Sequence, residues 1–333
     1  MVVDVVLGMQ YGDEGKGKVT HHLAREGNYD FVLRFNGGGN AGHTIYHEGK
    51  KVVTHYVPAG VFYGIPSLIG PGCVVNPQNL IKEIQDLEES GIKCRHLVKV
   101  ANNCHVITED HVNAESNESK IGTTRTGNGP AYAAKYGRTG ITAAEVPELQ
   151  HYVFDFFEDF LCREDVVVLA EGAQGFSLDI DFGSYPFVTS SHVTLGGLML
   201  SGISPKSIRS VYGVAKVYET YVGAMQFQNP NDKMLTTIGD VGNEYGATTG
   251  RRRQVSYLDL NRLFKAVKIN HPTTLIFNKL DVLREVDCWI VNDGKTSIKS
   301  SSEREFTTVI KTFVESAFDN DIEIRFSDSP QFI

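Results

Sequence analysis

Residues 2–26 read VVDVVLGMQYGDEGKGKVTHHLARE, and this stretch decides the fold. Its β-branched apolar run, Val2–Leu7, predicts a buried strand. A glycine-rich loop follows, and the apolar spacing of a helix begins at about Lys16. This order brings free backbone N–H groups and the positive end of a helix dipole to one place. The stretch therefore predicts a P-loop-like nucleotide-binding loop after the first strand of an α/β fold.

The loop departs from the P-loop pattern at one position. Gly12 to Lys18 fits G-x-x-x-x-G-K, but Val19 stands where Ser or Thr would hold magnesium. So short a pattern also arises by chance in a glycine-rich chain, so an ordinary strand–turn–helix is not excluded by it alone. Asp13 is more informative, because a carboxylate among phosphates is repulsive unless it binds a metal ion or transfers a proton.

Segments with strand and helix patterns alternate along the rest of the chain. The alternation favours a large, mainly parallel central sheet flanked by helices, with ligand loops at the carboxyl ends of the strands. No internal repeat or linker is evident, so one domain over residues 1–333 is expected. Strands are expected at 2–7, 31–35, 52–56, 67–69, 74–75, 97–100, 166–170, 208–218 and 274–277, and helices at 18–25, 77–89, 148–160, 257–270 and 303–318.

Composition narrows the classes of partner. The net charge of −8 argues against non-specific binding of nucleic acid, which needs a basic surface. No apolar run approaches the length of a membrane span, and the strand-like residues 2–7 do not read as a signal peptide. The five cysteines are scattered and form no C-x-x-C pair, so we expect neither a zinc site nor disulfides. A reducing cytoplasm is the predicted compartment.

Four further loops carry polar chemistry. The glycine-rich segment 36–44 contains His43, which suits a general acid, although a lone histidine is as often structural. Residues 121–130 form a third loop that is rich in hydroxyls and glycine, and the segment 171–175 follows the expected strand 166–170. Three arginines at 251–253 suit the binding of a carboxylate or phosphate, although a solvated basic surface would also explain them.

The last loop, Asn278-Lys279-Leu280-Asp281, follows the expected strand 274–277. An N-K-x-D segment in this position can recognise guanine, because the aspartate accepts hydrogen bonds from N1–H and the 2-amino group. Adenine offers no such pair of donors. Four residues alone leave this interpretation open.

Taken in order, these segments resemble the adenylosuccinate synthetase family. The resemblance extends from the first strand nearly to the C-terminus, and seven ordered motifs are far more specific than any one of them. The motifs are QYGDEGKGK at 10–18, NAGHT at 40–44, IGTT at 121–124, EGAQG at 171–175, YPFVTSS at 185–191, GATTGRRR at 246–253 and NKLD at 278–281.

The resemblance implies a reaction in which L-aspartate is joined to C6 of IMP while GTP is hydrolysed. Asp13 is then the base that removes the N1 proton, so that O6 attacks the γ-phosphate of GTP. His43 is the corresponding acid, and Gln174 supports the negative purine intermediate. Mg²⁺ is the implied cofactor, with Asp13 and the backbone carbonyl of Gly42 as its protein contacts.

The same resemblance assigns the binding residues. Arg138 is implied to reach the active site of the other subunit, so a homodimer is expected. The implied contacts to the monophosphate are Asn40, Thr124, Arg138, Gln174, Thr189 and Val222. Those to L-aspartate are Thr248, Thr249 and Arg251. Those to GTP are Gly12, Glu14, Gly15, Lys16, Gly17, Arg253, Lys279, Asp281 and Ser327.

Three segments depart from the family pattern. Arg125 replaces a glycine of the third loop, and Ser327-Asp328-Ser329-Pro330 replaces Ser-Thr-Gly-Pro. Residues 221–229, YVGAMQFQN, replace the run RVGxGPFPT beside the sugar, and this must change the loop because Pro fixes φ and Gly permits positive φ. A phage branch of the family uses dGMP, some of its members accept ATP, and in its better-known members a small residue replaces the loop aspartate.

Asp13 and the NKLD segment are both retained here, which favours IMP and GTP. The altered sugar-side segment keeps dGMP or GMP open as the acceptor. Two other classes remain to be separated from the ligase. A GTP-binding regulatory protein would not need aspartate and would leave His43, Gln174 and the arginines unexplained. A catalytically inactive structural homologue would have no reason to keep Asp13, His43 and Gln174 together.

Overall fold

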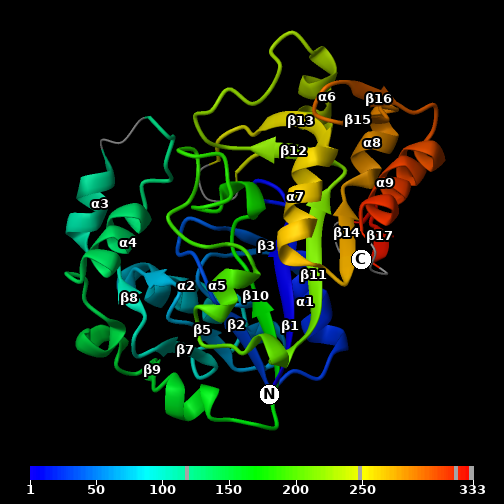
Figure 1. The fold of residues 1–333 in the computed structure, drawn as a ribbon. Coiled ribbons are helices and arrows are strands. Elements are labelled where there is room, and N and C mark those ends of the chain that lie inside the picture. Colours follow the sequence, from blue (N-terminus) through cyan, green and yellow to red (C-terminus); the bar gives the residue numbers. More distant parts are fainter. Residues whose placement is uncertain (117–119, 247–249, 319–321, 330–333) are drawn as a thin grey trace.

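The computed structural model describes residues 1–116, 120–246, 250–318 and 322–329. Its centre is a nine-stranded sheet with helices packed against it (Figure 1). The strand order is β17-β14-β11-β1-β10-β2-β5-β7-β9, and each neighbouring pair is parallel. The strands are β1 Val2–Gly8, β2 Phe31–Arg34, β5 Ser67–Ile69, β7 Val98–Ala101, β9 Val153–Phe154, β10 Val167–Glu171, β11 Ile208–Lys216, β14 Thr274–Asn278 and β17 Glu323–Phe326.

Smaller sheets lie outside this central one. A four-stranded sheet has the order β12-β13-β15-β16, and two further pairs are β3 with β4 and β6 with β8. Their bounds are β3 His43–His47, β4 Lys50–Thr54, β6 Val74–Val75, β8 His105–Val106, β12 Tyr218–Tyr221, β13 Gln254–Asp259, β15 Ile290–Asn292 and β16 Ser297–Lys299.

The helices connect and cover these strands. The α-helices are α1 Lys16–Glu26, α2 Pro77–Glu89, α3 Glu109–Ser116, α4 Asn128–Gly137, α5 Leu195–Met199, α6 Lys233–Val241, α7 Leu260–Asn270, α8 Leu280–Val286 and α9 Glu303–Ala317. Short 3₁₀ turns are η1 Ala59–Tyr63, η2 Ala143–Glu145, η3 Pro147–Leu149, η5 Phe176–Leu178 and η6 Pro205–Ser207, and η4 Phe157–Leu161 is a π-turn.

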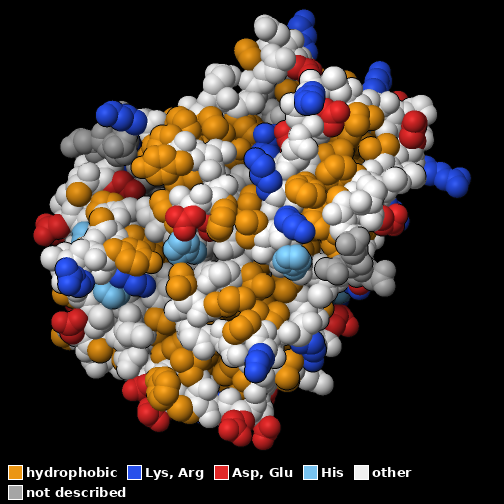
Figure 2. Space-filling model, viewed as in Figure 1, with side chains coloured by type: hydrophobic (Ala, Val, Ile, Leu, Met, Phe, Trp, Pro, Cys, Tyr) orange, Lys and Arg blue, Asp and Glu red, His pale blue; other side chains and the backbone are white. Residues whose placement is uncertain are grey.

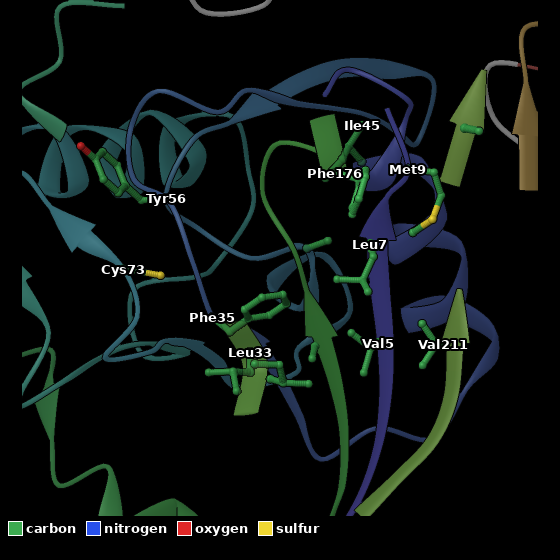
Figure 3. Packing of buried hydrophobic residues seen from close by; sticks show 14 of the residues in the cluster. Val5, Leu7, Met9, Leu33, Phe35, Ile45, Tyr56, Cys73, Phe176 and Val211 are labelled. Atoms are coloured by element: carbon green, nitrogen blue, oxygen red, sulfur yellow. The ribbon is translucent and has the colours of Figure 1, made fainter. Parts of the chain in front are cut away.

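Strand β1 is buried on both sides of the sheet. Val5 and Leu7 point into the main core beside Leu33 and Phe35 (Figure 3). Val6, the residue between them, packs into a second cluster on the opposite face. Side chains of a strand alternate between its two faces, so an unbroken apolar run marks a strand covered on both. The predicted strand at residues 2–7 is confirmed.

The expected helix at 148–160 is wrong. Its apolar spacing is real, but Val153 pairs with Val100 to place β9 at the edge of the sheet. The Asp155 carboxylate then accepts the N–H groups of Phe157 and Glu158, which starts a new short turn. Pairing with the sheet and this local cap divide the segment into three pieces.

Two other boundaries were misplaced. The expected helix at 257–270 begins only at Leu260, because Asp259 ends β13 and caps α7 through the N–H of Arg262. The expected strand at 208–218 is divided, since β11 ends at Lys216 and β12 belongs to another sheet. The expected strand at 52–56 is β4, which pairs with β3 outside the central sheet.

Candidate active site

A cavity of about 770 Å³ opens at the carboxyl ends of the central strands. Loops that follow β1, β2, β10, β11 and β14 contribute to its wall, as expected for a parallel sheet. Most of the residues chosen from the sequence meet here. These are Gly12, Asp13, Glu14, Gly15, Lys16, Gly17, Asn40, Gly42, His43, Thr124, Gln174, Thr189, Val222, Arg251, Arg253, Lys279 and Asp281.

Four of the chosen residues are not placed in the wall. Arg138 and Ser327 are not among the residues that line the cavity in the described part of the chain. Arg138 ends α4 with a φ of 61°, and Ser327 is buried just behind the wall. Thr248 and Thr249, the predicted aspartate-binding threonines, lie outside the described residues.

The glycine-rich loop is held from within by Glu14. The Glu14 carboxylate, which is 1% exposed, accepts hydrogen bonds from the N–H groups of Gln10 and Gly12. It also pairs with Lys16 at 2.7 Å. Glu14 therefore shapes the loop with its side chain, and only its backbone is free to face a nucleotide.

Gly15 allows the loop to turn into α1. It has a φ of 97°, which favours glycine, and it is the N-cap of the helix. The Asn278 amide donates to the carbonyl of Glu14 at 2.7 Å, and a Cβ on Gly15 would lie 2.9 Å from this amide. Glycine is required here both by φ and by the close approach of Asn278.

Asp13 lies at one end of an ionic network. Its side chain is 27% exposed, and its Oδ2 accepts a hydrogen bond from Arg253 Nε at 2.7 Å. Arg253 also pairs with the buried Glu244, which pairs in turn with Lys216 at 3.1 Å. Burial alone would lower the pKa of Arg253, but the carboxylates of Asp13 and Glu244 outweigh burial and raise that pKa. The chain thus fixes Asp13 in position while leaving part of it open to the cavity.

His43, at the start of β3, is held by two residues that the motifs did not single out for this role. Its Nδ1 contacts Glu171 Oε1, and Arg34 donates to the same oxygen at 2.8 Å. Burial and the charge of Arg34 lower the pKa of His43 to about 4. Burial would raise the pKa of Glu171, but His43 and Arg34 outweigh it and hold that pKa at about 2.

Gln174 joins two of the loops. Its Nε2 donates to Asn40 Oδ1 at 2.9 Å, and its backbone has a φ of 57°. Positive φ at a residue other than glycine is uncommon and often marks a functional site. The two predicted ligand-binding side chains are therefore in direct contact.

The three arginines at 251–253 have different partners. Arg251 donates to the carbonyls of Gly122 and Thr123, so the arginine segment crosses the hydroxyl-rich loop. Arg252 pairs with Asp240 near the surface. Of these three arginines, Arg251 and Arg253 line the cavity and Arg252 does not, so the basic cluster divides into two residues of the cavity wall and one surface residue.

The NKLD segment forms another part of the wall. Lys279, with a φ of 72°, donates to the carbonyl of Gly242 at 2.9 Å, while Asp281 is in the first turn of α8. Lys18, which ends the glycine-rich motif but was not chosen as a binding residue, donates to Ser327 Oγ at 2.9 Å and so reaches the C-terminal segment. Burial lowers the pKa of Lys18 to about 8.

New contacts order the segment that departs from the family pattern. Tyr221 and Phe227 both pack on Tyr11, with ring centroids 5.4 and 5.0 Å away. The Gln254 amide accepts from the N–H of Phe227 and donates to the carbonyl of Met225. At the other departure, Arg125 has a φ of 58°, so the arginine keeps a backbone shape that glycine adopts freely.

A second cluster of metal-ligand side chains does not line the cavity. Asp179, Asp181 and His192 bring their ligand atoms within 4.8 Å of one another. The Asp179 carboxylate already accepts the N–H groups of Asp181, Phe182 and Val193. These bonds explain its burial as a loop anchor.

The fold and the site define a class: an α/β protein whose glycine-rich loop lines a cavity at the carboxyl edge of a parallel sheet, as in nucleotide-dependent enzymes. The family model of adenylosuccinate synthetase matches residues 5–160 and 148–294. The chain is 38% identical to adenylosuccinate synthetase of Chlorobium chlorochromatii over 84% of this chain and 76% of the relative. It is 40% identical to that of Xylella fastidiosa over 85% of this chain and 78% of the relative.

The chain therefore belongs to the adenylosuccinate synthetase family, a family of GTP-dependent ligases that form a carbon–nitrogen bond. Family enzymes are metal-dependent, and IMP, GTP and L-aspartate are their substrates.

Two solved structures match the fold. Adenylosuccinate synthetase of Plasmodium falciparum in its fully ligated form has a TM-score of 0.83, with 28% identity over 99% of this chain and 98% of that one. Succinoaminodeoxyadenylate synthetase of cyanophage S-2L, bound to dGMP and dATP, has a TM-score of 0.72, with 23% identity over 94% of this chain and 99% of that one. The second match concerns the fold alone.

Within the described ranges, no helix is both long and apolar enough to cross a membrane.

Proposed function

We propose that the chain joins L-aspartate to C6 of IMP, using GTP and passing through a 6-phosphoryl intermediate. The observation that carries this proposal is the position of Asp13. Its partly exposed carboxylate lies in the glycine-rich loop, in the same cavity as His43 and Gln174. A nucleotide-binding loop needs no carboxylate to hold phosphates, whereas activation of a 6-oxopurine needs a base.

Asp13 removes the proton from N1, which makes O6 nucleophilic toward the γ-phosphate of GTP. Negative charge arriving beside His43 favours its protonated form, which donates a hydrogen bond to the transferring group. The amine of L-aspartate then displaces phosphate at C6. Gln174, held by Asn40, stabilises the negative charge on the purine.

Mg²⁺ is the proposed cofactor. Asp13 and the carbonyl of Gly42 would hold it, and both residues line the cavity next to the glycine-rich loop. Carboxylate and carbonyl oxygens are the ligands that this hard cation prefers, so the residues fit. When bound, the ion neutralises charge on the phosphates and orients them for in-line transfer.

GTP is assigned to the part of the cavity between the glycine-rich loop and α8. Gly12, Gly15, Lys16 and Gly17 are proposed to bind the phosphates through backbone N–H groups and the helix start, with Glu14 shaping the loop. Asp281 accepts two hydrogen bonds from guanine, and Lys279 covers the base. Arg253 and Ser327 complete the proposed GTP contacts.

The acceptor nucleotide and L-aspartate are proposed to bind to the remaining part of the cavity wall. Asn40, Thr124 and Thr189 are proposed to hold the monophosphate, and Val222 its sugar. Arg251 is proposed to bind L-aspartate together with Thr248 and Thr249. The hydrogen bonds from Arg251 to Gly122 and Thr123 support this arrangement, because they bring the aspartate and monophosphate loops together.

A homodimer is proposed, with Arg138 binding the monophosphate of the partner subunit. Two observations support it. Arg138 is not placed in the wall of its own described cavity, and the hydrophobic side chains of Tyr136, Tyr185 and Leu200 are 66, 77 and 69% exposed. Figure 2 shows hydrophobic side chains gathered in patches over the middle of one face.

Two further proposals concern the whole chain. Residues 1–333 act as one domain, supported by one large hydrophobic cluster that runs from Val3 to Phe318. The cytoplasm is the proposed compartment, supported by five free cysteines, of which four are buried.

A second acceptor is favoured by one observation. The segment 221–229 borders the sugar position and is ordered by aromatic contacts with Tyr11, in place of the family's glycines and prolines. A changed sugar pocket would suit dGMP, because dGMP lacks the 2′-hydroxyl that IMP carries. The regulatory alternative has no comparable support, because it assigns no task to His43 or Gln174.

A substrate matrix separates these proposals. IMP, dGMP and GMP are each combined with GTP or ATP in the presence of L-aspartate and Mg²⁺, and products are identified by mass. Turnover of IMP with GTP is the expected result. If dGMP is turned over and IMP is not, the acceptor assignment is reversed. Hydrolysis of GTP in the absence of an acceptor or of L-aspartate would exclude the ligase.

A further inference from the structure

Asn128, the first residue of α4, has an unused hydrogen-bond donor in the wall of the cavity. Its side chain is 5% exposed, and it lines the cavity. Its Nδ2 has no hydrogen-bond partner among the described residues. Buried donors are rarely left unpaired in folded proteins, so each such group requires an explanation. A ligand that accepts hydrogen bonds would supply the missing partner.

The neighbours of Asn128 fix the orientation of its amide. Oδ1 accepts a hydrogen bond from Thr126 Oγ1 at 3.4 Å, and Thr126 Oγ1 lies 3.0 Å from Thr124 Oγ1. A Cβ on Gly38 would lie 2.9 Å from both amide atoms, so the amide packs directly on this glycine. With Oδ1 engaged and one side covered, Nδ2 is the atom left for a ligand.

The start of α4 provides further donors at the same place. The helix has ten residues and begins after Gly127, and the first N–H groups of any helix lack partners within it. Glu115 accepts the N–H of Gly127 at 2.6 Å and the hydroxyl of Thr123 at 2.7 Å. These two hydrogen bonds engage the Glu115 carboxylate, and Asn128 Nδ2 stays unpaired among the described residues. A helix start and a free amide donor both favour an anion.

We propose that Asn128 binds the 5′-phosphate of the acceptor nucleotide through Nδ2. This inference rests on the proposed function, in which Asn40, Thr124 and Thr189 hold the monophosphate. Thr124 is connected to Asn128 through Thr126, so the added donor belongs to the same wall. Asn128 thus discriminates a nucleotide from the corresponding nucleoside, and it does so whichever 6-oxopurine the acceptor carries.

The test compares Asn128→Asp with Asn128→Ala. Aspartate keeps the shape but replaces the donor with a negative charge, and alanine removes the donor alone. Calorimetry measures the Kd of IMP, inosine, ribose 5-phosphate and GTP. We expect the Kd of IMP to rise about 100-fold in the first variant and about 10-fold in the second. The Kd of inosine and of GTP should stay within about twofold.

Asn103→Asp is the matched control, since Asn103 is exposed in a loop that does not line the cavity. It should leave every Kd unchanged. The assignment is overturned if both Asn128 variants bind IMP and ribose 5-phosphate like the wild type. Equal weakening of inosine also overturns it, because the phosphate would then not be the group recognised.

The two proposals fail in different ways. If the wild type binds dGMP or GMP instead of IMP, the acceptor assignment is wrong. The role of Asn128 is then measured with the nucleotide that binds, because all three carry the same 5′-phosphate. Ribose 5-phosphate tests the same contact without any base, so its response to the two variants decides the assignment of Asn128 independently.

Discussion

Asp13 and Arg253 form an ion pair, with 2.7 Å between Oδ2 and Nε, although 240 residues separate them along the chain. Arg253 reaches Asp13 because Glu244 holds its other end inside the protein. Arg253 therefore positions the carboxylate of the proposed base. The ion pair also connects the glycine-rich loop to the segment proposed to bind L-aspartate.

Replacement of Asp13 tests the proposed base. Asp13→Ala should lower kcat by at least about a thousandfold, because no other described carboxylate takes its place in the loop. The Kd of GTP should change by less than about fivefold, since backbone N–H groups hold the phosphates. Steady-state kinetics and equilibrium binding measure the two effects. A variant that retains a tenth of the wild-type kcat would exclude Asp13 as the base.

The ion pair itself is tested by comparing neighbouring arginines. Arg253→Ala should lower kcat/KM by about a hundredfold, because it frees Asp13 and leaves Glu244 without one partner. Arg252→Ala is the matched control. Arg252 pairs with Asp240 at a surface position, so its loss should change kcat/KM by less than about threefold. Equal losses in the two variants would show that general basic charge, and not the ion pair, is required.

Glu171 is expected to act through His43. Glu171→Gln removes the charge that orients the imidazole, and kcat should fall about 10- to 100-fold with little change in the KM of GTP. Since Arg34 then lacks its partner, thermal stability should also fall, and unfolding is recorded for both proteins. An unchanged kcat in a folded variant would mean that Glu171 serves stability alone.

Acid should destabilise the protein through His21. Burial, with His47 and Arg25 nearby, lowers the pKa of His21 to about 4 in the folded state. The unfolded side chain takes up a proton near pH 6.5, so stability is fully present above that pH and is lost as pH falls toward 4. From pH 7 to pH 5, wild type should lose about 1–2 kcal/mol more than His21→Gln in urea unfolding. His151→Gln, at an exposed position, is the control. Equal losses in wild type and His21→Gln would contradict the role of His21.

Base recognition is tested at Asp281. Asp281→Asn exchanges one acceptor for a donor, so the KM of GTP should rise at least about a hundredfold with kcat less affected. Asp287→Asn at the other end of α8 is the matched control, since Asp287 contacts Trp289 and does not line the cavity. A normal KM for GTP in the first variant would remove Asp281 from the base site.

The sequence predicted the parts that depend on local pattern. The strand, loop and helix of residues 2–26 were found correctly, because an apolar run, a glycine cluster and helical spacing are local signals, and the helix expected at 77–89 is α2, which Asn76 caps. The broken segment 148–160 could not be predicted, because the pairing of Val153 with Val100 depends on residues far away in the chain. The domain count stays a prediction.

The candidate site shows the same division. Asp13, His43 and Gln174 stand in recognisable motifs, and they meet in one cavity. Arg34 and Glu244 were not singled out, because their importance comes from buried contacts with Glu171 and Arg253. No local pattern marks an arginine on a strand as the partner of a distant glutamate. Asn128 was visible as a residue of the third loop, but its unpaired amide appears only after folding.

The bond from Asn278 to the carbonyl of Glu14 has a consequence for how a nucleotide is read. Asn278 ends β14 and directly precedes the proposed base-recognition residues, whereas Glu14 belongs to the loop assigned to the phosphates. This hydrogen bond therefore fixes the spacing between the proposed base site and the proposed phosphate site. A nucleotide whose base and phosphates are not separated by that spacing could not occupy both sites at once.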